Sequence, residues 1–190
     1  MLPQDLHIHT VFSTGDSAVM PQQTPEFVAS VNHAQVRGIS DHIEYIDETI
    51  FPSYEKRLRS LGFHVGMEIV QYEDVEYSLE LPLEYRVIHC YNEDRYYKAA
   101  ERMVETGVPL IIAHPMAVDT NLSKVPTGAY IEISNRYVWR KDWASFFPPH
   151  QDRFQFVFSS DAHQPHWLNQ VIARQVGETL GIQESILFEK

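Results

Sequence analysis

Short apolar runs bounded by turn residues recur at seven places along the chain. They are rich in Val, Ile, Phe and Tyr, a composition that is typical of buried β-strands. The runs are QDLHIH (4–9), AQVRGIS (34–40), GFHVGMEIV (62–70), YRVIHC (85–90), VPLIIAH (108–114), AYIEIS (129–134) and FQFVFSS (154–160). This pattern predicts seven short strands.

Stretches with helical character lie between several of these runs. Residues 25–32 begin with Pro25 after Thr24, a suitable N-cap, and residues 92–107 open with a capping residue and acidic positions and end at a glycine. Residues 164–181 also end at a glycine. Strands that alternate with helices predict a mostly parallel sheet, either closed or open.

The number of strands favours a closed, TIM-like (β/α)7 barrel over an open doubly wound sheet. A full eight-stranded barrel takes roughly 250 residues, so a chain of 190 residues must be a trimmed version. Residues 41–61 and 115–128 are too irregular to predict long helices. The acidic segment 72–84, which alternates apolar and polar residues, predicts a hairpin or a rim loop.

The composition is that of an ordinary globular protein, with 44% hydrophobic and 22% charged residues. One domain over residues 1–190 is expected, because domains usually span about 100–200 residues. The net charge of −11 argues against binding to long nucleic acids or to anionic membranes. The chain has no signal-peptide pattern, no stretch of roughly 18 apolar residues and a single cysteine, so a cytoplasmic location is expected.

Residues able to bind a metal ion stand at the carboxyl end of nearly every predicted strand. In parallel α/β folds these ends share one face, so residues far apart in the sequence can meet there. The two histidines of the first run have the same parity, as do Asp161 and His163, so each pair points to one side of its strand. In chain order these residues are His7 and His9, Asp41 and His42, Glu68, His89, His114, and Asp161 and His163, while the sixth run ends in EISNR, with Glu132, Asn135 and Arg136 nearby.

Any one of these histidines, taken alone, is more often a hydrogen-bonded structural residue than a ligand. Their recurrence at strand ends favours a shared metal site instead. Imidazoles mixed with carboxylates favour Zn, Mn or Fe over a thiolate-bound structural zinc. About nine ligands exceed the roughly four to six positions around one ion, so the pattern predicts two to three divalent ions.

Six motifs lie between residues 5 and 163, in the chain order DLHIHT, GISDH, GMEI, YRVIHC, AHP and SSDAH. In this combination the chain resembles the polymerase and histidinol phosphatase (PHP) family. The resemblance implies a distorted seven-stranded β/α barrel that holds three metal ions at the carboxyl ends of its strands. It also implies the hydrolysis of phosphate esters by a metal-activated hydroxide.

The resemblance further implies how the ligands divide among the ions. Asp16 has an alternative interpretation as an ordinary turn residue beside Gly15. Asp41 is expected to orient an imidazole and not to bind metal itself. The implied sets are His7, His9, Glu68 and Asp161 for one ion, Glu68, His89 and His114 for a second ion that shares Glu68, and Asp16, His42 and His163 for a third.

Three of these residues, Glu68, Asp161 and His163, are the expected catalytic residues. Asp161 or His163 would assist proton transfer to the leaving group. Arg136 and Asn135 are the expected substrate-binding residues, because an arginine can bind two phosphate oxygens at once.

Each substrate-binding expectation has an alternative. Arg136 lies beside Tyr137 and could equally be a solvated loop residue. Arg140 and Lys141 are weaker candidates for contacts with phosphate.

The remaining histidines and the cysteine have structural interpretations. His64 is expected to have a structural role, because it lies four residues before Glu68. His33, His150 and His166 are expected on the surface or in loops, and His166 is the one near enough to the site to touch a substrate. Cys90 follows a predicted ligand but faces the other way, so it is expected in the core.

The expected substrate is a small phosphorylated metabolite, a nucleotide or a short oligonucleotide. An amidohydrolase-type hydrolase of C–N bonds also begins with His-x-His, and a non-catalytic regulatory domain could use the same scaffold. The paired Asp41 and His42, the shared Glu68 and the closing SDAH favour the phosphoesterase. Missing outer helices would leave an apolar flank suited to a homo-oligomer.

Overall fold

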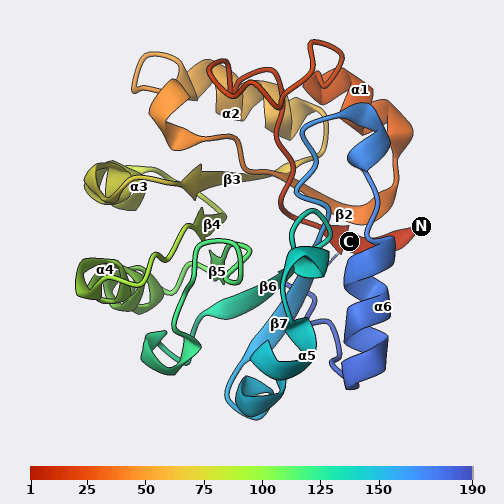
Figure 1. The fold of residues 1–190 in the computed structure, drawn as a ribbon. Coiled ribbons are helices and arrows are strands. Elements are labelled where there is room, and N and C mark those ends of the chain that lie inside the picture. The colour runs from red at the N-terminus through yellow and green to blue at the C-terminus, as the bar shows by residue number, and fades with distance from the viewer. Residues whose placement is uncertain (190) are drawn as a thin grey trace.

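Seven parallel strands form one sheet that curves into a barrel (Figure 1). The computed structural model describes residues 1–189. Each strand pairs with the next one along the chain, so the spatial order is the sequence order. Every strand overlaps a predicted run, which confirms the seven-stranded, TIM-like α/β barrel. The strands are β1 (Leu2–Asp5), β2 (Ala34–Ile39), β3 (His64–Ile69), β4 (Tyr85–Ile88), β5 (Leu110–Ile112), β6 (Tyr130–Ser134) and β7 (Gln155–Ser159).

The seam between β1 and β7 closes through a few specific contacts. One parallel bridge joins Ile8 to Ala162, just beyond the two strands. The side-chain amide of the buried Gln170 donates to the carbonyl oxygen of Gln4 in β1 at 2.9 Å and to that of Phe158 in β7 at 3.0 Å. A glutamine side chain therefore ties the first strand to the last, and the barrel is nearly closed.

Helices cover the outside of the barrel (Figure 1). As predicted, Thr24 caps the first helix, because its side chain accepts a hydrogen bond from the backbone N–H of Phe27 at 3.1 Å. No helix among residues 1–189 has the length and apolar content that a membrane crossing requires. The helices are α1 (Pro25–Val31), α2 (Phe51–Ser60), α3 (Val75–Glu80), α4 (Asp94–Glu105), α5 (Trp143–Phe146) and α6 (Val171–Leu180), with short 3₁₀ turns between them.

Two segments are more helical than the sequence pattern predicted. The interval 41–61, which was expected to be irregular, contains the ten-residue helix α2, whose buried residues Phe51, Tyr54 and Leu58 are spaced by three and four. The segment 72–84 is a 3₁₀ turn followed by α3, so the expected hairpin or loop was wrong. Helical spacing of apolar residues outweighed the local alternation in that segment.

The C-terminal helix is shorter than predicted. A 3₁₀ turn occupies Pro165–Trp167, and α6 begins only at Val171. The side-chain oxygen of Asn135, at the end of β6, accepts from the backbone N–H groups of Ile172 and Ala173 at 2.8 and 3.2 Å. The start of α6 is therefore fixed by a residue from another part of the chain, which local sequence cannot indicate.

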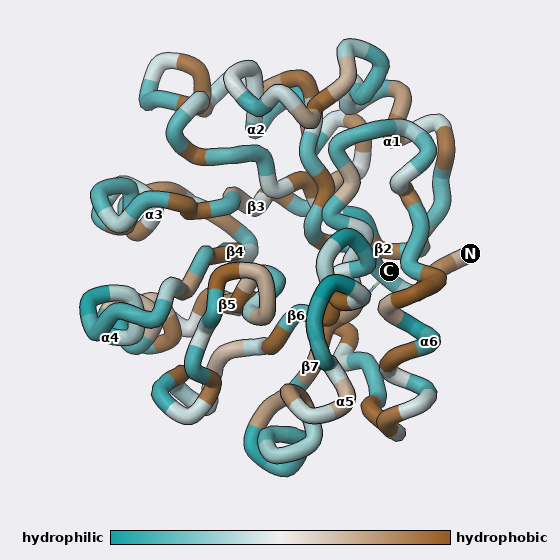
Figure 2. The backbone as a smooth tube through the Cα atoms, viewed as in Figure 1, coloured by the Kyte–Doolittle hydropathy of each residue, from teal (hydrophilic) through white to brown (hydrophobic). Residues whose placement is uncertain are grey.

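The interior of the barrel is filled by a small apolar cluster around Tyr85. A side chain at Gly38 or Gly66 would collide with this ring, since a Cβ there would lie 2.3 Å from its nearest atom. Figure 2 shows hydrophobic and hydrophilic segments alternating along the backbone, in the strands as well as in the loops. The buried members of the cluster are Leu6, Val36, Tyr85, Val87, Ile111, Ala113 and Val157.

The C-terminal segment seals the amino end of the barrel. The Gln4 side chain donates to the carbonyl oxygen of Ser185 at 2.6 Å and accepts from the backbone N–H of Leu187 at 3.0 Å. The ring of Phe188 stacks on His64 with ring centroids 4.0 Å apart. The chemistry of the strand ends is thus confined to the opposite, carboxyl face.

Cys90 is fully buried in the core, as predicted, and burial raises the pKa of its thiol to about 12. We expect the native protein to resist alkylation by iodoacetamide at about pH 8, because the thiolate is the reactive form. The same reagent should modify one thiol per chain after unfolding in urea. Rapid labelling of the folded protein, followed by mass spectrometry, would contradict this.

Candidate metal centre

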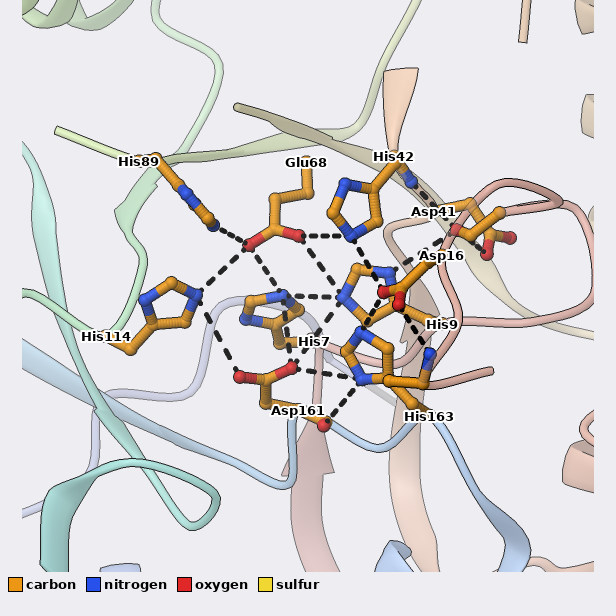
Figure 3. Close-up of polar contacts among 12 residues, drawn as sticks. His7, His9, Asp16, Asp41, His42, Glu68, His89, His114, Asp161 and His163 are labelled. Carbon is orange, nitrogen blue, oxygen red and sulfur yellow. Dashed lines mark hydrogen bonds and ion pairs between the residues drawn. The ribbon is translucent and has the colours of Figure 1, made fainter. Parts of the chain in front are cut away.

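The predicted metal ligands converge at the carboxyl face of the barrel (Figure 3). They come from β3 and from the segments that follow β1, β2, β4, β5 and β7, so the cluster depends on the whole fold. His7 and His9 lie beyond β1, which ends at Asp5 and is shorter than predicted. Both rings still turn to the cluster, while Ile8 between them is buried in the outer apolar core. The residues drawn together are His7, His9, Asp16, His42, Glu68, His89, His114, Asp161 and His163.

Glu68, in β3, lies at the centre of the cluster and is 2% exposed. Its two oxygens face opposite groups of histidines (Figure 3). Glu68 Oε1 lies 3.1 Å from the Nε2 atom of His7, 2.8 Å from that of His89 and 3.3 Å from that of His114. Glu68 Oε2 lies 3.3 Å from the Nε2 atom of His9 and 3.4 Å from that of His42. One buried carboxylate therefore stands between two sets of imidazoles, the arrangement of a bridging ligand.

Asp161 approaches the same cluster from β7. Its Oδ1 lies 3.9 Å from His7 Nε2 and 3.7 Å from His9 Nε2. Its other oxygen lies 3.9 Å from His114 Nε2. Glu68 and Asp161 thus place carboxylate oxygens on either side of the His7 and His9 rings.

Asp16 lies beside the third predicted set. Its Oδ2 is 2.8 Å from His163 Nε2 and 3.4 Å from His42 Nε2. Its carboxylate also accepts from the backbone N–H of Ala18 at 2.7 Å, as a turn residue would. The loop after β1 therefore brings Asp16 to both histidines with which the resemblance grouped it.

Three groups of ligand atoms among residues 1–189 are close enough to share an ion, with all atoms of a group within 4.8 Å of one another. These buried clusters could hold metal ions at the barrel's carboxyl face. The grouping differs in part from the implied one, because His7 and His9 each belong to two groups. The groups are His9 with His42 and His163, His7 with Glu68 and His114, and His7 with His9 and Asp161.

Glu132, in β6, has a role that the sequence did not reveal. It is fully buried and its carboxylate contacts His7 Nδ1 at 2.7 Å and the backbone N–H of His114 at 2.5 Å, and it also accepts from the Ser159 hydroxyl. Because a carboxylate only accepts, His7 must donate from Nδ1 and keep Nε2 for the cluster. A charged residue between Ile131 and Ile133 in a buried strand was the available signal.

Asp41 supports the site by a different route from the one predicted. It contacts no imidazole among the described residues; its oxygens accept from the backbone N–H and hydroxyl of Thr10 at 2.6 and 2.7 Å and from the Ser13 hydroxyl at 2.7 Å. The same Ser13 oxygen lies 3.5 Å from His9 Nδ1 and accepts from the backbone N–H of His42 at 3.0 Å. Asp41 therefore orients His9 through Ser13.

The positions of the His7 and His9 Nε2 atoms show whether the cluster is suited to a metal ion. Both rings point Nδ1 outward, to Glu132 and to Ser13, so their Nε2 atoms face each other 3.0 Å apart. Two facing lone pairs at that distance need a cation between them, either a proton or a metal ion. His114 Nδ1 is buried without a hydrogen-bond partner, so its ring is free to use Nε2 toward the cluster. The donor set fits divalent ions.

Electrostatics in the cluster follow from its mixture of charges. Burial lowers the pKa of His7, but the carboxylates of Glu132, Glu68 and Asp161 outweigh burial and hold that pKa well above its usual value. Burial raises the pKa of Glu68, yet His7 and His89 bring it well below its usual value. Without an ion, protons on imidazoles supply the positive charge that the buried carboxylates require.

Metal binding is therefore expected to release protons. Burial lowers the pKa of His42, but Asp16 and Glu44 outweigh it and raise the pKa to about 10, so this ring is protonated at neutral pH. A ligating imidazole must be neutral, so affinity for Zn²⁺ or Mn²⁺ should rise between about pH 6 and pH 9. Titration calorimetry in buffers of different ionisation enthalpy measures the released protons. A binding heat independent of the buffer would contradict this.

The backbone is strained at two cluster residues. His114 has φ of 24° and Asp161 has φ of 52°, in the left-handed region that non-glycine residues rarely adopt. Both residues lie two positions beyond the end of their strands, where the alternation of side chains along a strand no longer gives their orientation. The backbone N–H of His114 is held by Glu132 in this conformation.

The predicted substrate-binding residues lie at one edge of the cluster. Arg136 Nη1 is 3.4 Å from Asp161 Oδ1 and 3.1 Å from the His163 ring nitrogens. Asn135 uses its side chain to fix the start of α6, as described, and its Nδ2 also donates to Asn169 Oδ1 at 3.2 Å. Lys141 pairs with Asp119, outside the cluster. Of the predicted cations, Arg136 is thus the one in contact with the site.

The other histidines lie away from the metal cluster. His64 binds Glu84 at 2.9 Å near the amino end of the barrel, in keeping with a structural role. His33 is more buried than expected for a surface residue, because it contacts the buried Asp5 at 2.9 Å, with its side chain 7% exposed. His166 is exposed, and its ring lies 5.9 Å from that of Trp167.

No family model and no curated protein matches the chain. Among solved structures, the chain is similar to dihydropteroate synthase from Xanthomonas albilineans in complex with indole-2-carboxylic acid and 6-chloroguanine. The TM-score is 0.52 at 10% sequence identity, over 95% of this chain and 85% of that chain. At this identity the likeness shows the fold alone. The chain is a TIM-like α/β barrel with buried histidine and carboxylate clusters that could hold metal ions.

Proposed function

We propose that the protein is a metal-dependent phosphoesterase of the PHP family, with two to three divalent ions in its site. The observation that carries this proposal is the buried Glu68 carboxylate, with ring nitrogens of five histidines within 3.4 Å of its oxygens. A carboxylate in this position would bridge two ions. Bound divalent ions lower the pKa of water and stabilise negative charge on phosphoryl oxygens.

The chain's own residues set the positions of the ligands. Glu132 fixes the tautomer of His7, and Ser13, held by Asp41, contacts His9. Buried partners of this kind typically contribute about 10- to 100-fold to metal affinity or activity. Asp161 and His163, at the edge near Arg136, are the residues we propose for proton transfer to the leaving group.

Arg136 favours a phosphate ester over an amide as the substrate. Its guanidinium lies against Asp161 and His163 and is held over the rings of Tyr137 and Trp167, at 4.9 and 5.2 Å from their centroids. A guanidinium positioned beside a metal cluster suits two phosphate oxygens at once. A neutral amide substrate would bring no negative charge to this guanidinium.

A small substrate agrees with the charge of the protein. The net charge is −11, and long nucleic acids are bound through extended basic surfaces. We therefore propose a phosphorylated metabolite, a nucleotide or a short oligonucleotide as the substrate class, and a cytoplasmic location.

The deciding experiment combines metal analysis with an activity panel. Purified protein should contain about two to three ions per chain and should hydrolyse 4-nitrophenyl phosphate or its diester when supplied with Mn²⁺ or Zn²⁺. An amide panel should show no turnover. Turnover of amides without turnover of phosphate esters would instead identify a C–N hydrolase, and a metal-loaded protein inactive on every substrate would favour a non-catalytic role.

A further inference from the structure

A cavity of about 250 Å³ opens beside the metal cluster. Its walls come from the loop after β6, the loop after β7 and the first turn of α6. Arg136 and Ser160 belong to these walls, and Ser160 immediately precedes Asp161. A group attached to a phosphate at the cluster would therefore enter this cavity.

The walls of the cavity are aromatic and apolar. Trp139 and Trp167 lie on them together with Ile172. Trp139 leaves 58% of its surface exposed and Ile172 leaves 40%. Large apolar groups that remain exposed around a cavity mark binding surfaces. Trp167 also adjoins the cluster, since its ring centroid is 6.2 Å from that of His163.

Two arginines add positive charge to the aromatic walls. Arg140 lies over the rings of Tyr137 and Trp139, at 4.7 and 5.3 Å from their centroids. It has no carboxylate partner within 4.0 Å in the part of the chain that the structure describes. Arg136 Nε is buried and has no hydrogen-bond partner. Stacked guanidinium groups and indole rings together bind planar π-systems, as sites for single nucleotides and nucleobases do.

The cavity is held in a fixed shape by Asn135. Its side-chain oxygen binds two backbone N–H groups at the start of α6, and its nitrogen donates to Asn169 on the loop after β7. One side chain thus ties the three walls together. The volume is below the roughly 300–1,000 Å³ of drug-sized sites, so it suits one ring system and excludes a chain of several nucleotides.

We infer that this cavity binds a planar heteroaromatic group, such as a nucleobase, carried by the phosphate ester. This inference rests on the proposed phosphoesterase function, because it places the phosphate at the metal cluster. Trp139 and Trp167 provide the stacking surfaces, and Arg140 covers the outer edge. The protein then acts on mononucleotide-sized esters in preference to aliphatic ones.

Kinetics with two substrates test the inference. For Trp139→Ala and Trp167→Ala, the ratio of kcat/KM for adenosine 5′-monophosphate to that for glycerol 3-phosphate should fall roughly 5- to 150-fold, the loss of one stacked base. Trp143→Phe is the matched control, because this third tryptophan packs against the core on α5 and does not line the cavity. It should leave the ratio unchanged.

A binding measurement separates the inference from the proposed function. Adenosine 5′-monophosphate should quench tryptophan fluorescence of the metal-loaded wild type and of Trp143→Phe, and much less that of Trp139→Ala. Hydrolysis of glycerol 3-phosphate with no hydrolysis or quenching by the nucleotide would overturn the inference and leave the phosphoesterase standing. Nucleotide quenching without hydrolysis of any phosphate ester would support the cavity and overturn the proposed function.

Discussion

Replacement of Glu68 by glutamine is expected to abolish hydrolysis of an aryl phosphate and to lower the metal content of the purified protein. The amide keeps the size of the side chain but offers one ligand oxygen in place of two and carries no charge. The oxygen that faces His7, His89 and His114 and the one that faces His9 and His42 cannot then both be ligands. Loss of such an electrostatic group costs at least about 10²–10³-fold in kcat.

Elemental analysis and steady-state kinetics check this together. The bridged pair of ions should fall to one or none per chain, and circular dichroism should show that the barrel is intact. Glu101→Gln is a suitable control, since Glu101 is exposed on α4, outside the cluster. Wild-type activity with full metal content in Glu68→Gln would refute the bridging role.

Replacement of Glu132 by glutamine should have the next largest effect, although this residue contacts no substrate in our proposal. The backbone N–H of His114 needs an acceptor, so the single amide oxygen would turn to it and the NH₂ group would face His7. His7 would then accept at Nδ1 and carry its proton on Nε2, the atom that faces Glu68 and His9. We expect metal affinity to fall about 10- to 100-fold.

Titration of the metal-free Glu132→Gln variant with Zn²⁺ measures this effect directly. A second readout separates a positioning role from simple loss of stability: the ¹⁵N shifts of the His7 ring should report a change of tautomer in the folded variant. Breaking the buried pair should also lower the free energy of unfolding by about 3–5 kcal/mol. Unchanged affinity with an unchanged tautomer would show that Glu132 only fills space.

The order and number of strands could be predicted because apolar, β-rich runs bounded by turn residues mark buried strands whatever surrounds them. Their limits could not be predicted so well. β1 ends at Asp5, and the pairing resumes only as an isolated bridge between Ile8 and Ala162. The start of α6 depends on Asn135, which is 36 positions before Val171 in the sequence. Contacts between residues so far apart in the sequence cannot be recognised from the residues around the start of the helix.

All the residues of the cluster except Glu132 could be predicted from their positions in the sequence. Histidines and acids at strand ends predict a shared face, because parallel strands have a common direction. Glu132 also lies in the sixth run, but nothing in the sequence indicates which buried donors it meets. His7 and the backbone of His114 supply those donors only once the barrel has closed.

The sealed amino end of the barrel has a consequence for how the protein acquires its fold. Gln4 bonds to Ser185 and Leu187, at sequence separations of 181 and 183 residues. During synthesis, β1 leaves the ribosome long before its partner segment exists, so this end of the barrel is the last part to be assembled. Pairings of such long range slow folding, because the entropy of closing a large loop is lost before the contact forms. Until then, the apolar interior around Tyr85 is open at that end, and the barrel is most prone to aggregation before residues 185–188 dock.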